Sequence, residues 1–180
     1  MSKSRGIIIF GAAGSGTTTL GRALARLLEF KHIDVDSFSW QDPNNQMSGR
    51  LPHAQRVPLL QKVADNSSGF IMSGSICGWG DVFIPQFDLA VFIAAPMDIR
   101  LKRIKERETK QFGKRIAEGG DMFDHYNQFL DYAAIYDTGN PPERCRKLHE
   151  QWIEILPCPV VRLDGTRSGD KLIADIINKL

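Results

Sequence analysis

The sequence of 180 residues predicts an α/β fold in which helices cover both faces of a parallel sheet. Three observations favour this class. Short apolar runs alternate with segments of helical periodicity along the chain. The first run, residues 7–10, passes through a glycine-rich turn directly into a helical pattern. The length suits one domain with a substantial core, so we expect a single domain over residues 1–180.

The first elements follow from residue patterns. Residues 7–10 are four apolar residues in a row, which suits a strand buried on both faces. Apolar residues recur at helical spacing in residues 20–28 and again in residues 53–65, so we expect amphipathic helices there. Between them, residues 31–36 predict a short strand that ends in acids. Residues 37–52 are polar and contain proline and glycine, which predicts a loop.

The second half repeats the alternation. Residues 70–75 and 88–94 predict buried strands, and residues 97–109 predict a strongly basic helix. Residues 110–120 contain glycine and several cations, which favours a mobile flap. The remaining expected elements are helices at 121–136 and 142–156, a strand at 159–163 and a helix at 171–180.

The turn after the first strand carries Gly11, Gly14 and Gly16. Glycines allow positive φ, so consecutive backbone N–H groups can surround an anion, and the following helix N-terminus adds partial positive charge. The spacing fits G-x-x-x-x-G-K-[ST], with Thr18 at the Ser/Thr position and Thr17 in place of the lysine. Because threonine brings no charge, the turn predicts phosphate binding more strongly than catalysis. A strand–helix turn without a ligand is the alternative.

Asp34 and Asp36 have the spacing of two side chains on one face of a strand. Near a phosphate, they could hold a hydrated Mg²⁺ or accept the proton of a substrate hydroxyl; a pair of turn acids is the alternative. Thr18 is a candidate Mg²⁺ ligand, or a helix cap. In a parallel sheet, ligands gather beyond the carboxyl ends of the strands. That edge would bring together the glycine-rich turn, the two acids, and residues 73–75, 95–96 and 164–166.

The basic helix places Arg100, Arg103 and Arg107 on one face. Guanidinium groups bind phosphates well, so this face, with the cations of residues 110–120, could replace the charge that Thr17 lacks. For each residue singly, a solvated helix face is the alternative.

Composition excludes several classes of function. The formal charge of +2 gives no reason to expect nucleic acid or a charged membrane surface as a partner. The apolar run at residues 89–95 is too short to span a bilayer, and the N-terminal residues do not resemble a signal peptide. Cys77, Cys145 and Cys158 are odd in number and form no C-x-x-C pair, so we expect free thiols and a cytoplasmic location.

Five segments together resemble the P-loop nucleoside and nucleotide kinase family, which includes adenylate and shikimate kinases. They are GAAGSGTT, DVD, SGS, DLAVFIAAP followed by RLKRIKER, and LDGT, and they span nearly the whole chain. The resemblance implies a three-layer α/β/α fold with a five-stranded parallel sheet. It also implies an acceptor-covering segment at about 37–66 and a lid segment at about 108–121.

The resemblance also implies roles for individual residues. Those expected to bind ATP and its Mg²⁺ are Gly11, Gly14, Ser15, Gly16, Thr17, Thr18, Thr19, Gly165 and Thr166, with Thr18 and Asp34 nearest the metal. Those expected to act in transfer are Asp34, Asp36, Arg103 and Arg107. Those expected to bind the acceptor are Asp36, Arg56 and Ser75.

Two functions remain open from the sequence. The first is a phosphotransferase that moves a phosphoryl group from ATP to a small hydroxylated or phosphorylated acceptor. The second is a nucleotide- or phosphate-binding module without catalysis, which the threonine at position 17 favours. The expected partners are a nucleotide and a small-molecule acceptor, with no nucleic acid and no membrane.

Overall fold

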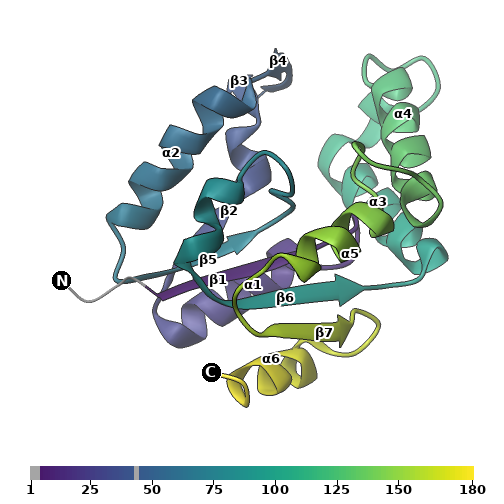
Figure 1. The fold of residues 1–180 in the computed structure, drawn as a ribbon. Coiled ribbons are helices and arrows are strands. Elements are labelled where there is room, and N and C mark those ends of the chain that lie inside the picture. The colour runs from purple at the N-terminus through teal and green to yellow at the C-terminus, as the bar shows by residue number, and fades with distance from the viewer. Residues whose placement is uncertain (1–4, 43–44) are drawn as a thin grey trace.

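The computed structural model describes residues 5–42 and 45–180. Its centre is a five-stranded parallel sheet with the strand order β2-β5-β1-β6-β7 (Figure 1). The strands are β1 (Arg5–Gly11), β2 (Lys31–Asp34), β5 (Gly69–Ser73), β6 (Phe87–Ala94) and β7 (Val160–Asp164). The predicted α/β fold with five parallel strands is therefore confirmed.

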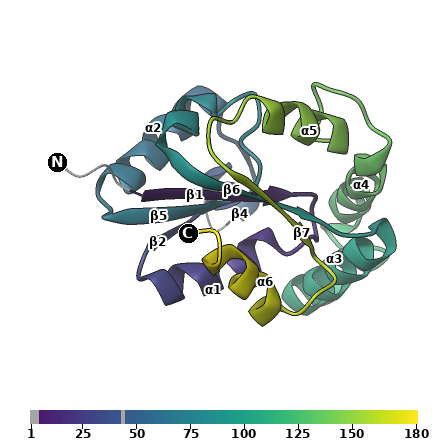
Figure 2. The ribbon, with the colours of Figure 1, turned by 60° about the horizontal axis from the view of Figure 1, so that its bottom comes forward.

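Helices lie on both faces of the sheet, which gives the three-layer arrangement (Figure 2). One face carries α1 (Thr17–Leu28) and α6 (Gly169–Ile177), and the other carries α2 (His53–Asp65) and α5 (Arg146–Glu154). Two further helices, α3 (Met97–Phe112) and α4 (Phe123–Ala134), lie beyond the carboxyl end of β6 (Figure 1). Within the described residues, no helix is both long and apolar enough to cross a membrane.

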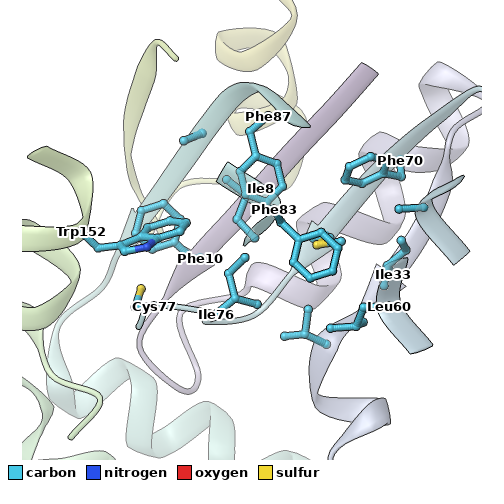
Figure 3. Packing of buried hydrophobic residues seen from close by; sticks show 14 of the residues in the cluster. Ile8, Phe10, Ile33, Leu60, Phe70, Ile76, Cys77, Phe83, Phe87 and Trp152 are labelled. Atoms are coloured by element: carbon cyan, nitrogen blue, oxygen red, sulfur yellow. The ribbon is translucent and has the colours of Figure 1, made fainter. Parts of the chain in front are cut away.

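The core is split in two by the sheet, as the alternation of β1 shows. Ile8 and Phe10 belong to the cluster under α2 and α5, where Leu60 and Trp152 also pack (Figure 3). Ile7 belongs to the opposite cluster, under α1 and α6. Since successive side chains of a strand point to opposite faces, an uninterrupted apolar run is what a central strand requires.

The prediction of a loop at 37–52 is wrong. A short 3₁₀ turn at Val35–Phe38 leads into an antiparallel hairpin of β3 (Trp40–Asp42) and β4 (Asn45–Arg50). Residues 43 and 44 lie outside the described part. Gln41, Asp42, Gly49 and Arg50 are all exposed, so among the side chains of the hairpin that the structure describes there is no alternation of buried and exposed residues to reveal a strand.

Several other boundaries differ from the predictions, and three of them lie near the carboxyl edge of the sheet. The strand expected at 31–36 ends at Asp34, where the 3₁₀ turn begins. Helix α3 continues through Phe112 and is followed by another 3₁₀ turn at Gly113–Ile116, so the first part of the expected flap is helical. Helix α5 begins at Arg146 rather than at residue 142. None of these shifts moves a strand end away from the carboxyl edge of the sheet.

Candidate active site

The glycine loop, residues 11–16, forms an open cradle at the carboxyl end of β1. Gly14 and Gly16 have φ of 79° and 106°, a conformation that favours glycine. Helix α1 begins at Thr17, and no side chain caps its N-terminus within the described residues. The N–H groups of its first turn therefore have no helical acceptor. The buried Ser15 hydroxyl also lacks a hydrogen-bond partner in the described part of the chain. Such unpaired donors suit an anion.

The cradle is held between two other segments. A Cβ atom on Gly14 would lie 2.5 Å from the carbonyl oxygen of Arg100, at the base of α3. A Cβ atom on Gly165 would lie 2.9 Å from the carbonyl oxygen of Ser15. Only glycine permits both approaches, so the glycine loop packs directly against α3 and against the turn after β7.

Arg103 connects these segments through hydrogen bonds. One terminal nitrogen donates to the carbonyl oxygen of Gly165 at 2.9 Å. The other lies 3.5 Å from the carbonyl oxygens of Gly14 and Ser15. Beside Gly165, the backbone N–H and hydroxyl of Thr166 both donate to Asp164, at 2.9 and 2.8 Å, which orders the turn. The two segments predicted to contact the nucleotide are thus joined by one predicted catalytic residue.

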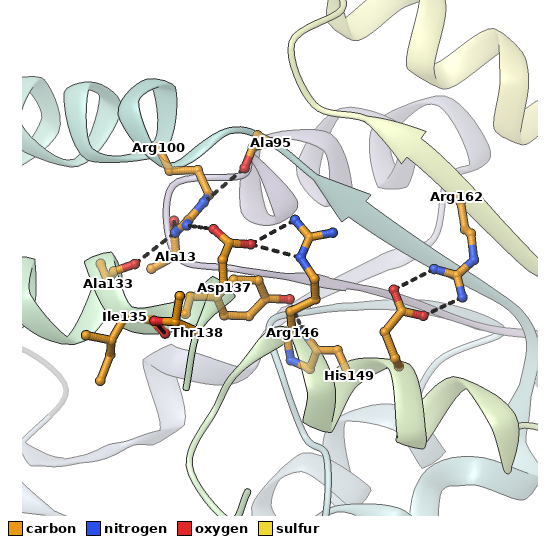
Figure 4. A network of polar contacts seen from close by, with 12 residues as sticks. Ala13, Ala95, Arg100, Ala133, Ile135, Asp137, Thr138, Arg146, His149 and Arg162 are labelled. Carbon is orange, nitrogen blue, oxygen red and sulfur yellow. Dashed lines mark hydrogen bonds and ion pairs between the residues drawn. The ribbon is translucent and has the colours of Figure 1, made fainter. Parts of the chain in front are cut away.

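The other two arginines of the α3 face lie in different surroundings. Arg100 is fully buried and donates to the carbonyl oxygens of Ala95 and Ala133, both at 3.0 Å, and to the Asp137 carboxylate at 2.8 Å (Figure 4). Arg107 is largely exposed and pairs with Glu108 at 2.7 Å. Arg100 therefore has a structural role, and the predicted role of Arg107 in transfer stays a prediction.

Asp34 and Thr18 lie together at the end of β2. The Thr18 side chain lies close enough to the Asp34 carboxyl group to lower its pKa, and that carboxyl accepts the backbone N–H of Asp36 at 3.2 Å. Burial raises the pKa of Asp34, and the charge of Asp36 raises it further. A hydroxyl and a carboxylate beside an anion cradle are oxygen donors of the kind that Mg²⁺ prefers. No group of three or more His, Cys, Asp or Glu suited to a metal occurs in the described part, so phosphate and water would complete the coordination.

A second cluster lies next to the acids and is called here the acceptor cluster: Asp36, Arg56, Ser75 and Arg144. Arg144 and Asp36 form an ion pair with an N–O distance of 3.6 Å. Arg56 is only 4% exposed; it lies 4.1 Å over the ring of Trp79 and donates to the carbonyl oxygen of Val35 at 3.4 Å.

The acceptor cluster carries more positive than negative charge. The Nε atom of Arg56 is buried without a hydrogen-bond partner in the described residues. Burial lowers the pKa of Arg56, and the positive charges of Arg50 and Arg144 lower it further, although Asp36 opposes them. Three guanidinium groups therefore act on one another around one carboxylate. An anionic ligand would relieve this repulsion and satisfy the free donor.

Ser75 reaches the same cluster from the end of β5. The preceding residue, Gly74, has φ of 112°, and a Cβ atom there would lie 3.7 Å from the Asp36 carboxylate. The Ser75 hydroxyl is paired with a ring nitrogen of His149 at 3.0 Å. The structure thus places the backbone that precedes Ser75 near Asp36, while the Ser75 hydroxyl contacts His149 in the core.

Arg144 is the site residue that sequence reasoning missed. It lies outside the regular elements, just before α5 begins, in a segment that the sequence pattern assigned to a helix. Its partner Asp36 lies on a distant part of the chain, so no local spacing links them. Of the other predicted residues, Thr19 is exposed on α1, and Thr17 lies at the start of that helix without supplying a charge.

Comparisons with known proteins assign the family. The AAA domain family matches residues 7–122, which include the glycine loop, both acids and Arg103. The cytidylate kinase of Methanococcoides burtonii (strain DSM 6242) is 30% identical and is matched over 96% of this chain and 94% of its own length. The chain belongs to the P-loop nucleotide and nucleoside kinase family.

Other known proteins are also similar to this P-loop kinase family member in sequence or in fold. The uncharacterized protein YqaC of Bacillus subtilis (strain 168) is 36% identical over 98% of this chain and 97% of YqaC. A shikimate kinase from Acinetobacter baumannii has a TM-score of 0.58 at 16% identity, covering 97% of this chain and 92% of that one. A sugar kinase from Janibacter sp. HTCC2649 has a TM-score of 0.55 at 19% identity, covering 97% and 93%. At these identities, the two structures show a shared fold.

Proposed function

We propose that this P-loop kinase family member transfers a phosphoryl group from ATP, with Mg²⁺, to a small acceptor that carries a hydroxyl and an anionic group. The carrying observation is that Asp34 lies between the anion cradle and the acceptor cluster: the Thr18 side chain acts on its carboxyl group, and that group accepts the backbone N–H of Asp36 at 3.2 Å. A binding module would need the cradle alone. A transfer enzyme needs both halves within reach of each other.

The nucleotide half of the site is the glycine loop with the turn after β7. Backbone N–H groups of the loop and the Ser15 hydroxyl would bind the phosphates, and Gly165 and Thr166 would lie near the base. Thr18 and Asp34 would hold Mg²⁺, which supplies charge neutralisation at the phosphates. Arg103 keeps the two segments in register through their carbonyl oxygens.

The acceptor half would orient the hydroxyl and take its proton. Asp34 and Asp36 are the candidate bases, and both lie at the carboxyl end of β2. The raised pKa of Asp34 makes it a stronger base than an ordinary carboxylate. Arg144 holds Asp36 by an ion pair, and Arg56 has a free donor for an anionic group of the acceptor.

The non-catalytic module remains the second candidate, because Thr17 stands where the phosphate lysine is expected. Neither Arg100 nor Arg103 replaces that cation freely, since backbone carbonyls and Asp137 engage their guanidinium groups. The two candidates therefore differ in turnover rather than in nucleotide binding.

A transfer assay with labelled ATP tests the proposal. The panel contains CMP, shikimate and gluconate as hydroxylated anions, with cytidine as the uncharged counterpart of CMP. Mg²⁺-dependent labelling of an anionic compound, and none of cytidine, is the expected result. Tight ATP binding without transfer to any compound would favour the module. Labelling of cytidine in preference to CMP would contradict the anionic acceptor.

A pair of variants tests the acceptor cluster itself. Arg144→Met removes the partner of Asp36, whereas Arg146→Met removes a cation that pairs with Asp137 instead. Only Arg144→Met is expected to raise KM for the acceptor, with KM for ATP kept. Equal effects of the two variants would remove Arg144 from the proposed site.

A cytoplasmic location, without a nucleic-acid or membrane partner, belongs to the same proposal.

A further inference from the structure

Three buried polar side chains form a chain that ends at the acceptor cluster. The hydroxyl of Tyr136 lies 2.7 Å from Nδ1 of His149, and Nε2 of His149 lies 3.0 Å from the hydroxyl of Ser75. His149 is fully buried, with its ring edge-on to those of Phe10 and Phe92. The chain runs beside the Arg100–Asp137–Arg146 contacts (Figure 4). A relay of this kind controls which groups donate protons.

His149 carries a single ring proton under ordinary conditions. Burial lowers its pKa to about 3, and the charge of Arg144 acts in the same direction. The neutral ring has one donor and one acceptor nitrogen, so two arrangements are open. In one, Tyr136 donates to Nδ1 and Nε2–H donates to Ser75. In the other, Ser75 donates to Nε2 and Nδ1–H donates to Tyr136.

The two distances favour the first arrangement. A separation of 2.7 Å is typical of a hydroxyl donor, and 3.0 Å is typical of an N–H donor. The second arrangement would also leave the Tyr136 hydroxyl proton without an acceptor, since the described residues offer it no other hydrogen-bond partner, and Tyr136 is buried. An unsatisfied buried donor is unfavourable.

The Cys77 thiol lies near the Ser75 side chain, which lowers the pKa of that thiol against the larger effect of burial. A thiol is a weak hydrogen-bond acceptor, so a ligand oxygen would compete well for the Ser75 proton. Asp36 lies beside the adjacent Gly74, and the charge of Arg144 acts on Cys77, so the segment that carries Ser75 borders both charged residues.

We propose that Tyr136 and His149 are positioning residues that fix Ser75 as a hydrogen-bond donor to the acceptor substrate. Nε2–H of His149 occupies a lone pair of the Ser75 oxygen and leaves its proton free for an acceptor oxygen. The chemical class selected is a ligand with an oxygen lone pair, such as a carboxylate, phosphate or ether oxygen. The tautomer stands on the structure alone; the donation to a substrate rests on the function proposed above.

Ring ¹⁵N NMR of the whole protein without ligand tests the tautomer. The expected result is protonated Nε2 and unprotonated Nδ1 at neutral pH. Tyr136→Phe keeps the ring that lies 5.1 Å from the Arg100 guanidinium carbon but removes the hydroxyl, and it is expected to populate both tautomers. Tyr126→Phe, a partly exposed tyrosine of α4, is the matched control and should leave the spectrum unchanged. Protonated Nδ1 in the wild type, or no response to Tyr136→Phe, would overturn the proposal.

Kinetics test the link to substrate with whichever anionic compound the transfer assay identifies. Tyr136→Phe is expected to raise KM for that compound about fivefold, since one hydrogen bond weakens, and to leave KM for ATP within about twofold. In a Ser75→Ala background, the same change should have no effect on KM. Additive losses would show that Tyr136 acts through general stability instead.

The NMR and kinetic experiments distinguish failure of the proposed function from failure of the proposed relay. If no compound is phosphorylated, the function proposed above fails while the tautomer result still decides the relay. If transfer occurs but the double variant behaves additively, the transfer stands and the relay to substrate falls. His149→Gln, which keeps a donor near the Nε2 position, should retain more acceptor affinity than His149→Asn. The reverse order would contradict the relay.

Discussion

Arg103 and Gly165 are joined by a hydrogen bond of 2.9 Å between a guanidinium nitrogen and a carbonyl oxygen. Because the same side chain also reaches the carbonyl oxygens of Gly14 and Ser15, α3 fixes the distance between the glycine loop and the turn after β7. Such an arginine acts on the shape of the nucleotide site. It differs from a free cation that approaches the phosphates from solvent.

We therefore expect Arg103→Met to weaken nucleotide binding. Loss of charged hydrogen bonds of this kind corresponds to about a tenfold or greater rise in KM for ATP. KM for the acceptor should change less. Arg162→Met serves as the control, because Arg162 lies on β7 and pairs with Glu150 at the surface. A fall in kcat with unchanged KM for ATP would instead support the predicted role of Arg103 in transfer.

Thr17→Lys is expected to increase turnover of ATP. The described arginines of α3 leave the lysine position without a dedicated cation, and one preorganised charge-stabilising group contributes roughly 100-fold to a rate. Thr17→Met, which is similar in bulk to the start of a lysine side chain but uncharged, is the control. A decrease with lysine and with methionine alike would mean that the space is already filled.

Asp34→Asn is expected to stabilise the protein while removing Mg²⁺-dependent transfer. Burial and the Asp36 charge raise the pKa of Asp34, so its ionised form destabilises the fold above the unfolded pKa of a carboxyl group. Neutral asparagine keeps the acceptor for the backbone N–H of Asp36. A rise in Tm of a few degrees is expected for about 1 kcal/mol at this chain length.

Asp36→Asn provides the contrast, because it leaves Arg144 without its ionic partner. It should not stabilise, and a lower Tm is expected. Thermal unfolding at neutral pH without ligand measures both variants. A lower Tm for Asp34→Asn would show that Asp34 is better paired than its surroundings indicate.

Acid should destabilise the protein through His149. Its pKa is about 3 in the folded state and near 6.5 when unfolded, so the unfolded state binds more protons between these values. The free energy of unfolding is expected to fall as pH drops below about 6.5, by at most about 1.4 kcal/mol per pH unit. Above that pH, His149 contributes no slope. Urea unfolding between pH 8 and pH 5 measures it.

His149→Gln should flatten that dependence, even if it lowers stability overall. His125→Gln, on α4, is the matched control and should keep the wild-type slope. Identical slopes for both variants and the wild type would place the acid sensitivity in another group.

Most of the fold could be predicted because its signals are local. Apolar runs identify the parallel strands, and the spacing of the glycines identifies the cradle from the sequence alone. The β3–β4 hairpin escaped because Gln41, Asp42, Gly49 and Arg50 are exposed and the described part of the hairpin shows no buried residue. The carboxyl edge of the sheet then followed from the strand directions.

The parts that escaped depend on partners distant in sequence. Arg100 belongs to a charge-rich helix, which indicates a solvated face, yet Asp137 and two carbonyl oxygens enclose it. Arg144 is recognisable as a site residue only from its contact with Asp36. The pairing of His149 with Ser75 likewise joins α5 to the end of β5. Local pattern carries no information on such contacts.

The buried guanidinium of Arg100 restricts which segments of this P-loop kinase family member can move. It anchors the first turn of α3 to the end of β6 and to the last turns of α4, so these three segments should move as one body. Any closing motion of residues 108–121 is therefore expected to pivot beyond Ile104, the last buried position of α3. Spin labels at positions 98 and 110 test this expectation: position 98 should stay fixed relative to the sheet, while position 110 should move.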